Sequence, residues 1–296
     1  MLTTQESFAR LDAALRPTSA DDELVARLGQ SLETRIGHHL PGFRGLHPAG
    51  AYSRGAAPRP PDPVDLLVEV DAPLGADGRP AVPAHPLLAR LALLVGGTTR
   101  PPRRRCRQAV DVRFPDWNLG FHLLPAVQGA EAWWIPDSQG GWLRTQPQQH
   151  RDDLVSADHA AGGRLLPLLR ILRWWRRARD AAGESLPCGG FHLETMASEP
   201  FRQWFPQPAP TSLPEGLAEI FAQLARRVHG PCSDSTRAGP RLDDTLALDT
   251  RLHAADQLAE AARIARAAVA ADRAGELEQA HLRWRVLLGP IYTFNR

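Results

Sequence analysis

The residues best suited to chemistry lie in one short stretch that begins with a glycine-rich turn. Gly50 opens the run Gly-Ala-Tyr-Ser-Arg-Gly, and Asp65 follows near the start of the run VDLLVEV. Glycine lets backbone N–H groups approach a phosphate closely, because it carries no Cβ. Carboxylate oxygens are the ligands that Mg²⁺ prefers, and carboxylates two residues apart on a strand share one face. A glycine turn before a strand that carries acids therefore suits metal-assisted chemistry on phosphates.

The elements that must position these residues can be predicted from periodicity and turn signals. Leu24, Leu28 and Leu32 recur at helical spacing, and Gly37 is expected to end that helix. The stretch over 41–63 is rich in turn residues, and Pro115 signals a turn further on. The expected elements are helices over 4–16, 21–40 and 85–95 and strands over 64–70, 109–114 and 119–127.

The second half of the chain has a different composition. From about residue 164 the sequence is rich in Ala, Leu and Arg at helical spacing, with a Gly/Pro/Ser/Asp loop over 229–244. The run over 164–182 places Leu, Ile and Trp on one side of a helix and Arg on the other. The sequence therefore predicts an α+β half over 1–160 and a helical lobe over 161–296.

Charge and cysteine content exclude several classes of protein. The net charge is +2, so no global positive field marks a nucleic-acid binder. All 35 basic residues are arginine, which is typical of a GC-rich genome. Three widely spaced cysteines do not form a disulfide framework. We expect no signal peptide, because the N-terminal residues lack an apolar core, and no membrane span. The expected location is cytoplasmic.

The order of these motifs resembles one protein family. GAYSRGAAPRPPDPVDLLV is similar to the Gly-Ser turn and Asp-x-Asp strand of the polymerase-β-like nucleotidyltransferases. Within that superfamily the chain resembles the bacterial CD-NTases, relatives of cGAS and oligoadenylate synthetase. LGFHLLPAV resembles the strand of their third carboxylate, and LLRILRWWRR and FHLETMA resemble two of their helices. The closing Ala-rich segment and its Trp-containing tail resemble their C-terminus.

The resemblance implies a fold and a reaction. The fold is a polymerase-β-like core with a mixed or antiparallel sheet, followed by a helical lobe. The reaction of the family uses three aspartates to hold two Mg²⁺ ions, which activate a hydroxyl and stabilise pyrophosphate as it leaves. The products are cyclic or linear oligonucleotides made from NTPs, and the setting is anti-phage defence.

This sequence departs from the family at the residues that hold the metals. The first metal-binding aspartate falls on Pro63, the second on Asp65 and the third on His122. Proline has no side-chain oxygen, and imidazole is a poor ligand for Mg²⁺. The two hydroxyls of the turn fall on Ala51 and Ala56. Asp65 is therefore the sole retained carboxylate, and we expect neither a bound metal nor another cofactor.

Other acids could take the place of the missing ones. If the protein is active, Asp65 would hold Mg²⁺ together with Asp62 or Glu69. Asp62 stands one residue before the expected position, and a slip of one residue turns a strand side chain to the opposite face. Further acids in this half of the chain are Asp71, Asp111 and Asp116.

The resemblance also assigns residues to ligand binding. The nucleotide-binding residues that it implies are Gly50, Ala51, Tyr52, Arg54 and Arg173. Arg173 matches a basic residue that reaches the triphosphate in the family, whereas a purely structural helix with snorkelling arginines is the other interpretation. A basic run between helix and strand is either a solvated loop or a nucleic-acid patch. It consists of Arg103, Arg104, Arg105 and Arg107.

His192 and Glu194 fall at the start of a helix that resembles the inner face of the family's C-terminal lobe. We interpret them as polar groups satisfied within the core.

Three functions remain open on the sequence alone. The first is a pseudo-nucleotidyltransferase that binds a nucleotide or nucleic acid as a sensor or regulatory component of a defence system, with a protein partner from the same operon. The second is an active Mg²⁺-dependent nucleotidyltransferase. The third is a scaffold. The loss of two acids and two hydroxyls together favours the first.

Overall fold

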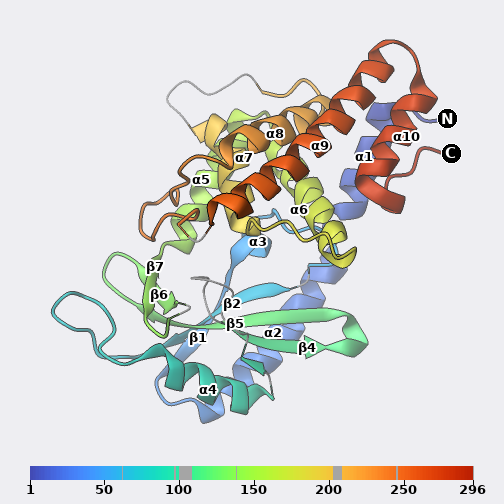
Figure 1. The fold of residues 1–296 in the computed structure, drawn as a ribbon. Helices are drawn as coiled ribbons and strands as arrows, with labels where there is room; N and C mark the ends of the chain where they lie inside the picture. Colours follow the sequence, from blue (N-terminus) through green and yellow to red (C-terminus); the bar gives the residue numbers. More distant parts are fainter. Residues whose placement is uncertain are drawn as a thin grey trace.

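The structure, a computed structural model, describes residues 1–61, 63–96, 98–99, 109–137, 139–202, 209–244 and 246–295. A sheet with two helices lies below a lobe of helices in Figure 1, and the short helix α3 (Gly50–Ser53) lies between them. The residues over 100–108, which include Arg103, Arg104, Arg105 and Arg107, lie outside the described part of the chain, as does Asp62.

The remaining elements follow the chain in order. In the first half they are α1 (Thr4–Leu15), α2 (Ser19–His39), β1 (Phe43–Ala49), β2 (Val64–Val70), α4 (Ala84–Val95), β3 (Thr98–Thr99), β4 (Val110–Phe114), the 3-10 turn η1 (Pro115–Trp117), β5 (Leu119–Gln128), β6 (Trp133–Pro136) and β7 (Trp142–Thr145). In the second half they are α5 (Pro147–Ala160), α6 (Leu165–Ala181), α7 (Gly190–Arg202), α8 (Leu213–Arg227), α9 (Leu248–Arg273), α10 (Leu277–Leu288) and η2 (Gly289–Ile291).

The described strands form one mixed sheet. Its order is β1-β2-β5-β4-β3, and β6 pairs with both β5 and β7 beyond this path. The central pair β2 and β5 is parallel, whereas β1 with β2 and β4 with β5 are antiparallel. A mixed sheet in the N-terminal half followed by a helical lobe is the α+β class that the sequence predicts.

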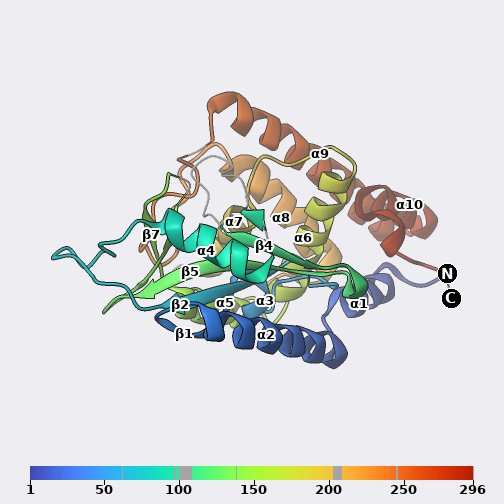
Figure 2. The same ribbon diagram turned by 90° about the horizontal axis from the view of Figure 1, so that it is seen from below.

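The alternation of side chains along the strands separates two faces of this sheet. Val64, Leu66 and Val68 of β2 pack with α2 and α4 in an apolar core. These two helices lie on the side of the sheet away from the helical lobe (Figures 1 and 2). The intervening residues of β2, which begin with Asp65, therefore face the other side, toward the helical lobe.

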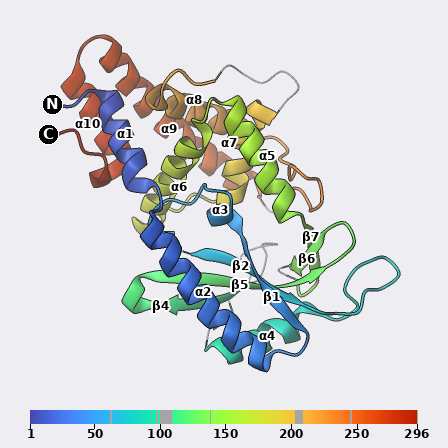
Figure 3. The same cartoon turned by 180° about the vertical axis from the view of Figure 1, so that it is seen from behind.

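The core of the helical lobe draws on both halves of the chain. It is built around Trp175, Phe221 and Trp284, and it also takes Phe8 from α1 and Leu154 from α5. Figure 3 shows α1 beside α6 and α10. Side chains from before residue 161 thus contribute to this core. The boundary between 160 and 161 stays a prediction, because nothing in the fold tests whether either part folds alone.

Most predicted elements are present, with two corrections. β2 spans the predicted residues, and α4, β4 and β5 lie within one residue of their predicted bounds. Gly37 does not end α2, which continues to His39 and is capped by Leu40. The turn-rich stretch contains the edge strand β1, whose glycine and proline obscured it. Its ladder with β2 runs from Phe43 to Ala49 and is irregular between Phe43 and Gly45.

Candidate functional site

Three polar side chains meet on the face of the sheet that looks toward the helical lobe. The parallel ladder pairs Asp65 of β2 with His122 of β5, and the antiparallel ladder pairs Asp111 of β4 with the same histidine. All three therefore lie in a line across neighbouring strands. We call Asp65, His122 and Asp111 the histidine row. Sequence reasoning considered Asp111 only as a spare acid, because the register that brings it here cannot be seen in one strand.

The imidazole of His122 stands between the two carboxylates. Its Nδ1 lies 3.0 Å from Oδ1 of Asp65, in a buried hydrogen bond. Its Nε2 lies 2.9 Å from Oδ1 of Asp111. His122 and Asp65 are buried, while Asp111 is partly exposed. Both ring nitrogens are thus in contact with carboxylate oxygens.

The glycine turn is pressed against the retained aspartate. Gly50 has a φ of +68°, and a Cβ built on it would lie 1.9 Å from Oδ2 of Asp65. Only glycine fits here, both for its backbone angle and for this close approach. Of the positions where the family has hydroxyls, Ala56 is fully buried and Ala51 packs against the helical core.

The other described acids weighed as substitutes lie elsewhere. Pro63, at the first aspartate position, is exposed and directly precedes β2. Glu69 lies 2.6 Å from Nε2 of His47, and Asp71 lies 2.5 Å from Arg44. The hydrogen bond and charge of Arg44 lower the pKa of Asp71. Asp116 is exposed in the turn η1. Of the described acids weighed as substitutes, only Asp111 lies in line with Asp65 across the strands, with His122 between them.

The predicted nucleotide-binding arginines belong to a second cluster, in which a buried glutamate lies between two guanidinium groups. Arg54 donates from Nε and Nη2 to Glu194 of α7, at 2.7 and 3.3 Å. Arg173 of α6 donates to the same carboxylate at 2.5 Å. We call Arg54, Glu194 and Arg173 the arginine cluster. Arg54 also lies over the ring of Phe191, 5.1 Å from its centroid.

Electrostatics hold this cluster in its charged form. Burial would raise the pKa of Glu194, but Arg54 and Arg173 outweigh it and lower the pKa to about 2. Burial lowers the pKa of Arg173, and Glu194 opposes that effect. Two cations against one anion leave a net positive charge, which suits an anionic ligand. Glu194 fits the interpretation of a polar group satisfied inside the protein.

Tyr52 and His192 occupy different surroundings. The Tyr52 hydroxyl donates to Oδ1 of Asp22 on α2 at 2.6 Å, which together with burial raises its pKa. His192 is buried, and burial lowers its pKa to about 4. Among the described residues its Nε2 has no hydrogen-bond partner. Neither side chain joins the histidine row.

A further histidine pair was missed by sequence reasoning, which treated His150 as ordinary. Its Nε2 lies 2.6 Å from Oδ1 of Asp234, with both side chains buried. Burial would raise the pKa of Asp234, but the hydrogen bond and charge of His150 lower it. The partners are 84 residues apart, so no spacing in the sequence signals the pair.

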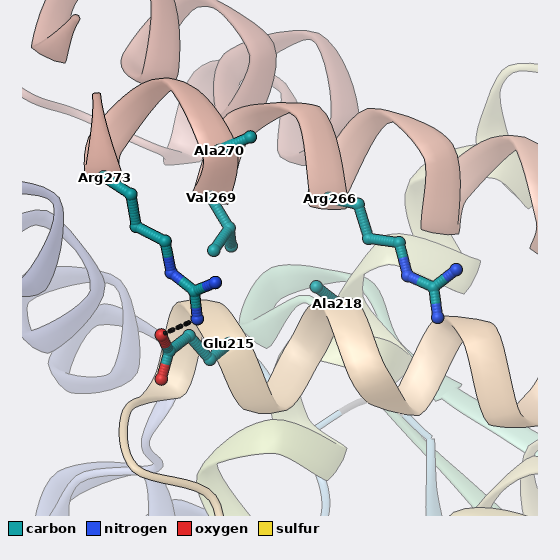
Figure 4. Close-up of a pocket in the computed structure, with 6 residues that line it drawn as sticks. All are labelled: Glu215, Ala218, Arg266, Val269, Ala270 and Arg273. Carbon is teal, nitrogen blue, oxygen red and sulfur yellow. Dashed lines mark hydrogen bonds and ion pairs between the residues drawn. The ribbon is translucent and has the colours of Figure 1, made fainter. Parts of the chain in front are cut away.

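An open hollow on the helical lobe is separate from both clusters. It lies between α8 and α9, as Figure 4 shows, and the guanidinium of Arg273 reaches Glu215 across it at 2.6 Å. Arg266 and Ala218 line its other end. None of its lining residues comes from the sheet, so it has no part in the candidate site.

The described residues do not fit a site for two Mg²⁺ ions. Within the described ranges no group of three or more His, Cys, Asp or Glu side chains could hold a metal ion. The histidine row offers oxygens only on either side of an imidazole, whereas Mg²⁺ requires a cage of oxygens. We therefore derive no catalytic step through a metal. No described helix is long and apolar enough to cross a membrane.

A mixed sheet with a glycine turn before an aspartate strand, covered by a helical lobe, defines the polymerase-β-like nucleotidyltransferase fold. Several solved structures align with this fold. CdnC of E. coli in complex with HORMA aligns at a TM-score of 0.71 and 16% identity over 98% of both chains. The CD-NTase CdnG of Bradyrhizobium diazoefficiens in complex with GTP aligns at 0.70 and 13% identity, over 96% of this chain and 94% of that one. A deletion mutant of the Vibrio cholerae di-nucleotide cyclase DncV aligns at 0.74 and 11% identity, over 99% and 98%.

Sequence comparison points the same way. No model of a known protein family matches the chain. A curated relative, the cyclic AMP-AMP-AMP synthase of an Acinetobacter strain, is 25% identical over 215 residues, which cover 67% of this chain and 59% of the relative. The chain thus spans about three fifths of that relative's length. Together the comparisons confirm the resemblance to the bacterial CD-NTases, and the chain has their fold.

Proposed function

We propose that this protein is a catalytically inactive nucleotidyltransferase of the CD-NTase type, which binds a nucleotide and acts as a sensor or regulatory component in anti-phage defence. One observation is the main support for the proposed loss of catalysis. The imidazole of His122 lies between Asp65 and Asp111, where metal catalysis would need oxygen ligands around two cations.

Two features support a retained ligand. The turn at Gly50 keeps the backbone conformation that lets N–H groups approach a phosphate. The arginine cluster keeps a net positive charge at the junction of the lobes. Among similar structures, CdnC was solved with ATP and CdnG with GTP. A nucleoside triphosphate is therefore the ligand we propose first, and a nucleic acid is the alternative.

A protein partner belongs to the same proposal. CdnC was solved in complex with a HORMA protein. A non-catalytic relative would act through such a contact, since it makes no product of its own. The cytoplasmic location predicted from the cysteines is part of this proposal, and Cys188 and Cys232 are free thiols.

The alternative function is an active Mg²⁺-dependent nucleotidyltransferase that makes cyclic or linear oligonucleotides. Asp111 favours it, because the ladder places this carboxylate one strand beyond His122 on the face that carries Asp65. The two acids would then have to bind metal from opposite sides of the histidine, with His122 displaced.

An activity assay separates the two. The purified protein is incubated with all four radiolabelled NTPs and Mg²⁺ or Mn²⁺, and products are resolved by chromatography. We expect no product. Robust product that is lost in Asp65→Ala, and retained in the exposed control Asp116→Ala, would overturn the proposal in favour of the active enzyme.

Binding is measured on the same preparation. Calorimetric titrations with ATP and GTP, and with RNA and DNA oligonucleotides, identify the ligand. We expect a nucleoside triphosphate to bind, and to bind more weakly in Arg173→Ala. If no nucleotide or nucleic acid binds, the scaffold function replaces this proposal.

A further inference from the structure

The histidine row has a charge pattern that differs from that of a vacant metal site. Its two outer members are carboxylates on separate strands, β2 and β4, and its central member is a buried imidazole on β5. Each ring nitrogen lies within 3.0 Å of a carboxylate oxygen. The ring therefore fills the space between the acids.

The distances on the two sides of the ring show how little space remains. Nδ1 lies 3.0 Å from Oδ1 of Asp65, and Nε2 lies 2.9 Å from Oδ1 of Asp111. A metal ion bound between two oxygens would need the place that the ring now occupies.

Asp65 also has little room left for a metal. Its Oδ1 is taken by His122, and its Oδ2 lies against the backbone of Gly50, where even a methyl group would not fit. The residue is 8% exposed. A divalent ion would have to displace either the imidazole or the glycine turn to reach this carboxylate.

We propose that His122 takes the place of a divalent cation in this protein, so that the nucleotide is bound without metal. The statement that a nucleotide binds here rests on the function proposed above. The positive charge facing the phosphates would come from the arginine cluster, whose Arg54 lies at the end of the helix that Gly50 begins. The expected ligand is a nucleoside triphosphate free of Mg²⁺.

The experiment has two arms on the intact protein. In the first, Mn²⁺ binding is followed by electron paramagnetic resonance for the wild type, for His122→Asp and for His47→Asp. His47 pairs with Glu69 on the same sheet and is half-exposed, so it is the matched control. We expect Mn²⁺ binding only in His122→Asp. Stoichiometric binding of Mn²⁺ to the wild type that is lost in Asp65→Asn would overturn the proposal.

The second arm measures the affinity of the wild type for ATP and GTP in EDTA and in Mg²⁺. We expect both nucleotides to bind in EDTA and to bind no more tightly in Mg²⁺, whereas a metal-dependent site would bind them roughly tenfold or more tightly in Mg²⁺ than in EDTA. Such a difference would overturn the proposal. In both arms the outcome that would overturn the proposal is measured on the wild-type protein. The test therefore does not depend on whether His122→Asp folds.

The two proposals fail in different ways. Product formation, or the absence of nucleotide binding in either buffer, overturns the proposed function. The statement that the nucleotide binds without metal is then overturned as well. The Mn²⁺ titration still decides whether His122 occupies the place of the cation. Nucleotide binding that requires Mg²⁺ overturns only the inference made here.

Discussion

The histidine row and the arginine cluster are built from opposite charge patterns. The row places one imidazole between two carboxylates, and the cluster places one carboxylate between two guanidinium groups. Among its three members the cluster thus has a surplus of positive charge, whereas the row is the richer in carboxylates. His122 occupies the place between the carboxylates that a metal would need. The arginine cluster, which suits a phosphate, is positively charged. Under the proposed function, ligand binding would be retained in this chain and catalysis would be lost.

The largest expected effect comes from the centre of the arginine cluster. Glu194→Ala leaves the buried Arg54 and the partly buried Arg173 without their partner, which should lower the free energy of unfolding by about 3–5 kcal/mol. Denaturant unfolding measures it. The control Glu219→Ala removes an exposed partner of Arg226 and should cost less than about 1 kcal/mol. Equal losses in the two variants would show that the cluster contributes no more than a surface pair.

The next effect concerns His192 and Glu194 on α7, which should change the free energy of unfolding in different ranges of pH. The folded His192 has a pKa of about 4 instead of 6.5, because it is buried, with Asp243 and Arg251 nearby. As the pH falls from 6.5 to 4, the unfolded chain takes up a proton that the folded chain does not. The free energy of unfolding should therefore fall, by up to about 3 kcal/mol.

Glu194 adds to this loss only below its ordinary pKa of 4.5, because its own pKa is about 2. His192→Gln should flatten the pH dependence of the unfolding free energy between 6.5 and 4.5. An unchanged slope in this variant would mean that His192 is not the group responsible.

A third effect tests the packing of the glycine turn on the row. Gly50→Ala combines an unfavourable φ with a clash against Asp65, whereas Gly78→Ala at a φ of +71° meets no atom within 4 Å. The control should cost about 1 kcal/mol, and Gly50→Ala should cost about 2 kcal/mol more. Thermal unfolding of both variants gives the difference. Matching costs would contradict the close approach to Asp65.

The smallest expected effect concerns the first missing acid. The double variant Pro63→Asp, His122→Asp supplies a carboxylate at each position where the family has one. It should bind Mn²⁺ roughly tenfold more tightly than His122→Asp alone, which is about 1.4 kcal/mol. Electron paramagnetic resonance gives both affinities. A folded double variant with no gain would count against Pro63 as the first metal position.

Local patterns were enough to predict much of the fold. The β-branched run VDLLVEV has strand propensity along its whole length, and β2 spans that run. The leucine spacing in α2 likewise predicts its buried stripe. β1 was missed because its glycine and proline are also turn residues, and its pairing with β2 outweighs that local preference.

The candidate site could be predicted only in part. Asp65, His122 and Gly50 were identified through the resemblance, and all three come together. The role of Asp111 depends on the register between β4 and β5, which one strand's sequence does not contain. The pairing of Arg54 with Glu194 spans 140 residues, so it follows from the packing of the lobes rather than from any local signal.

The segment after the glycine turn is bound to the helical lobe at several points. Arg54 pairs with α7, Arg170 of α6 donates to the carbonyl of Gly55 at 3.0 Å, and Arg177 donates to that of Pro60 at the same distance. At its other end the segment is attached to the sheet, because Gly50 directly follows Ala49 of β1 and Ala49 pairs with Asp65 in the ladder. Opening of the lobes would therefore break the arginine contacts of this segment while Gly50 stays beside Asp65, so the carboxylate would remain covered by the turn.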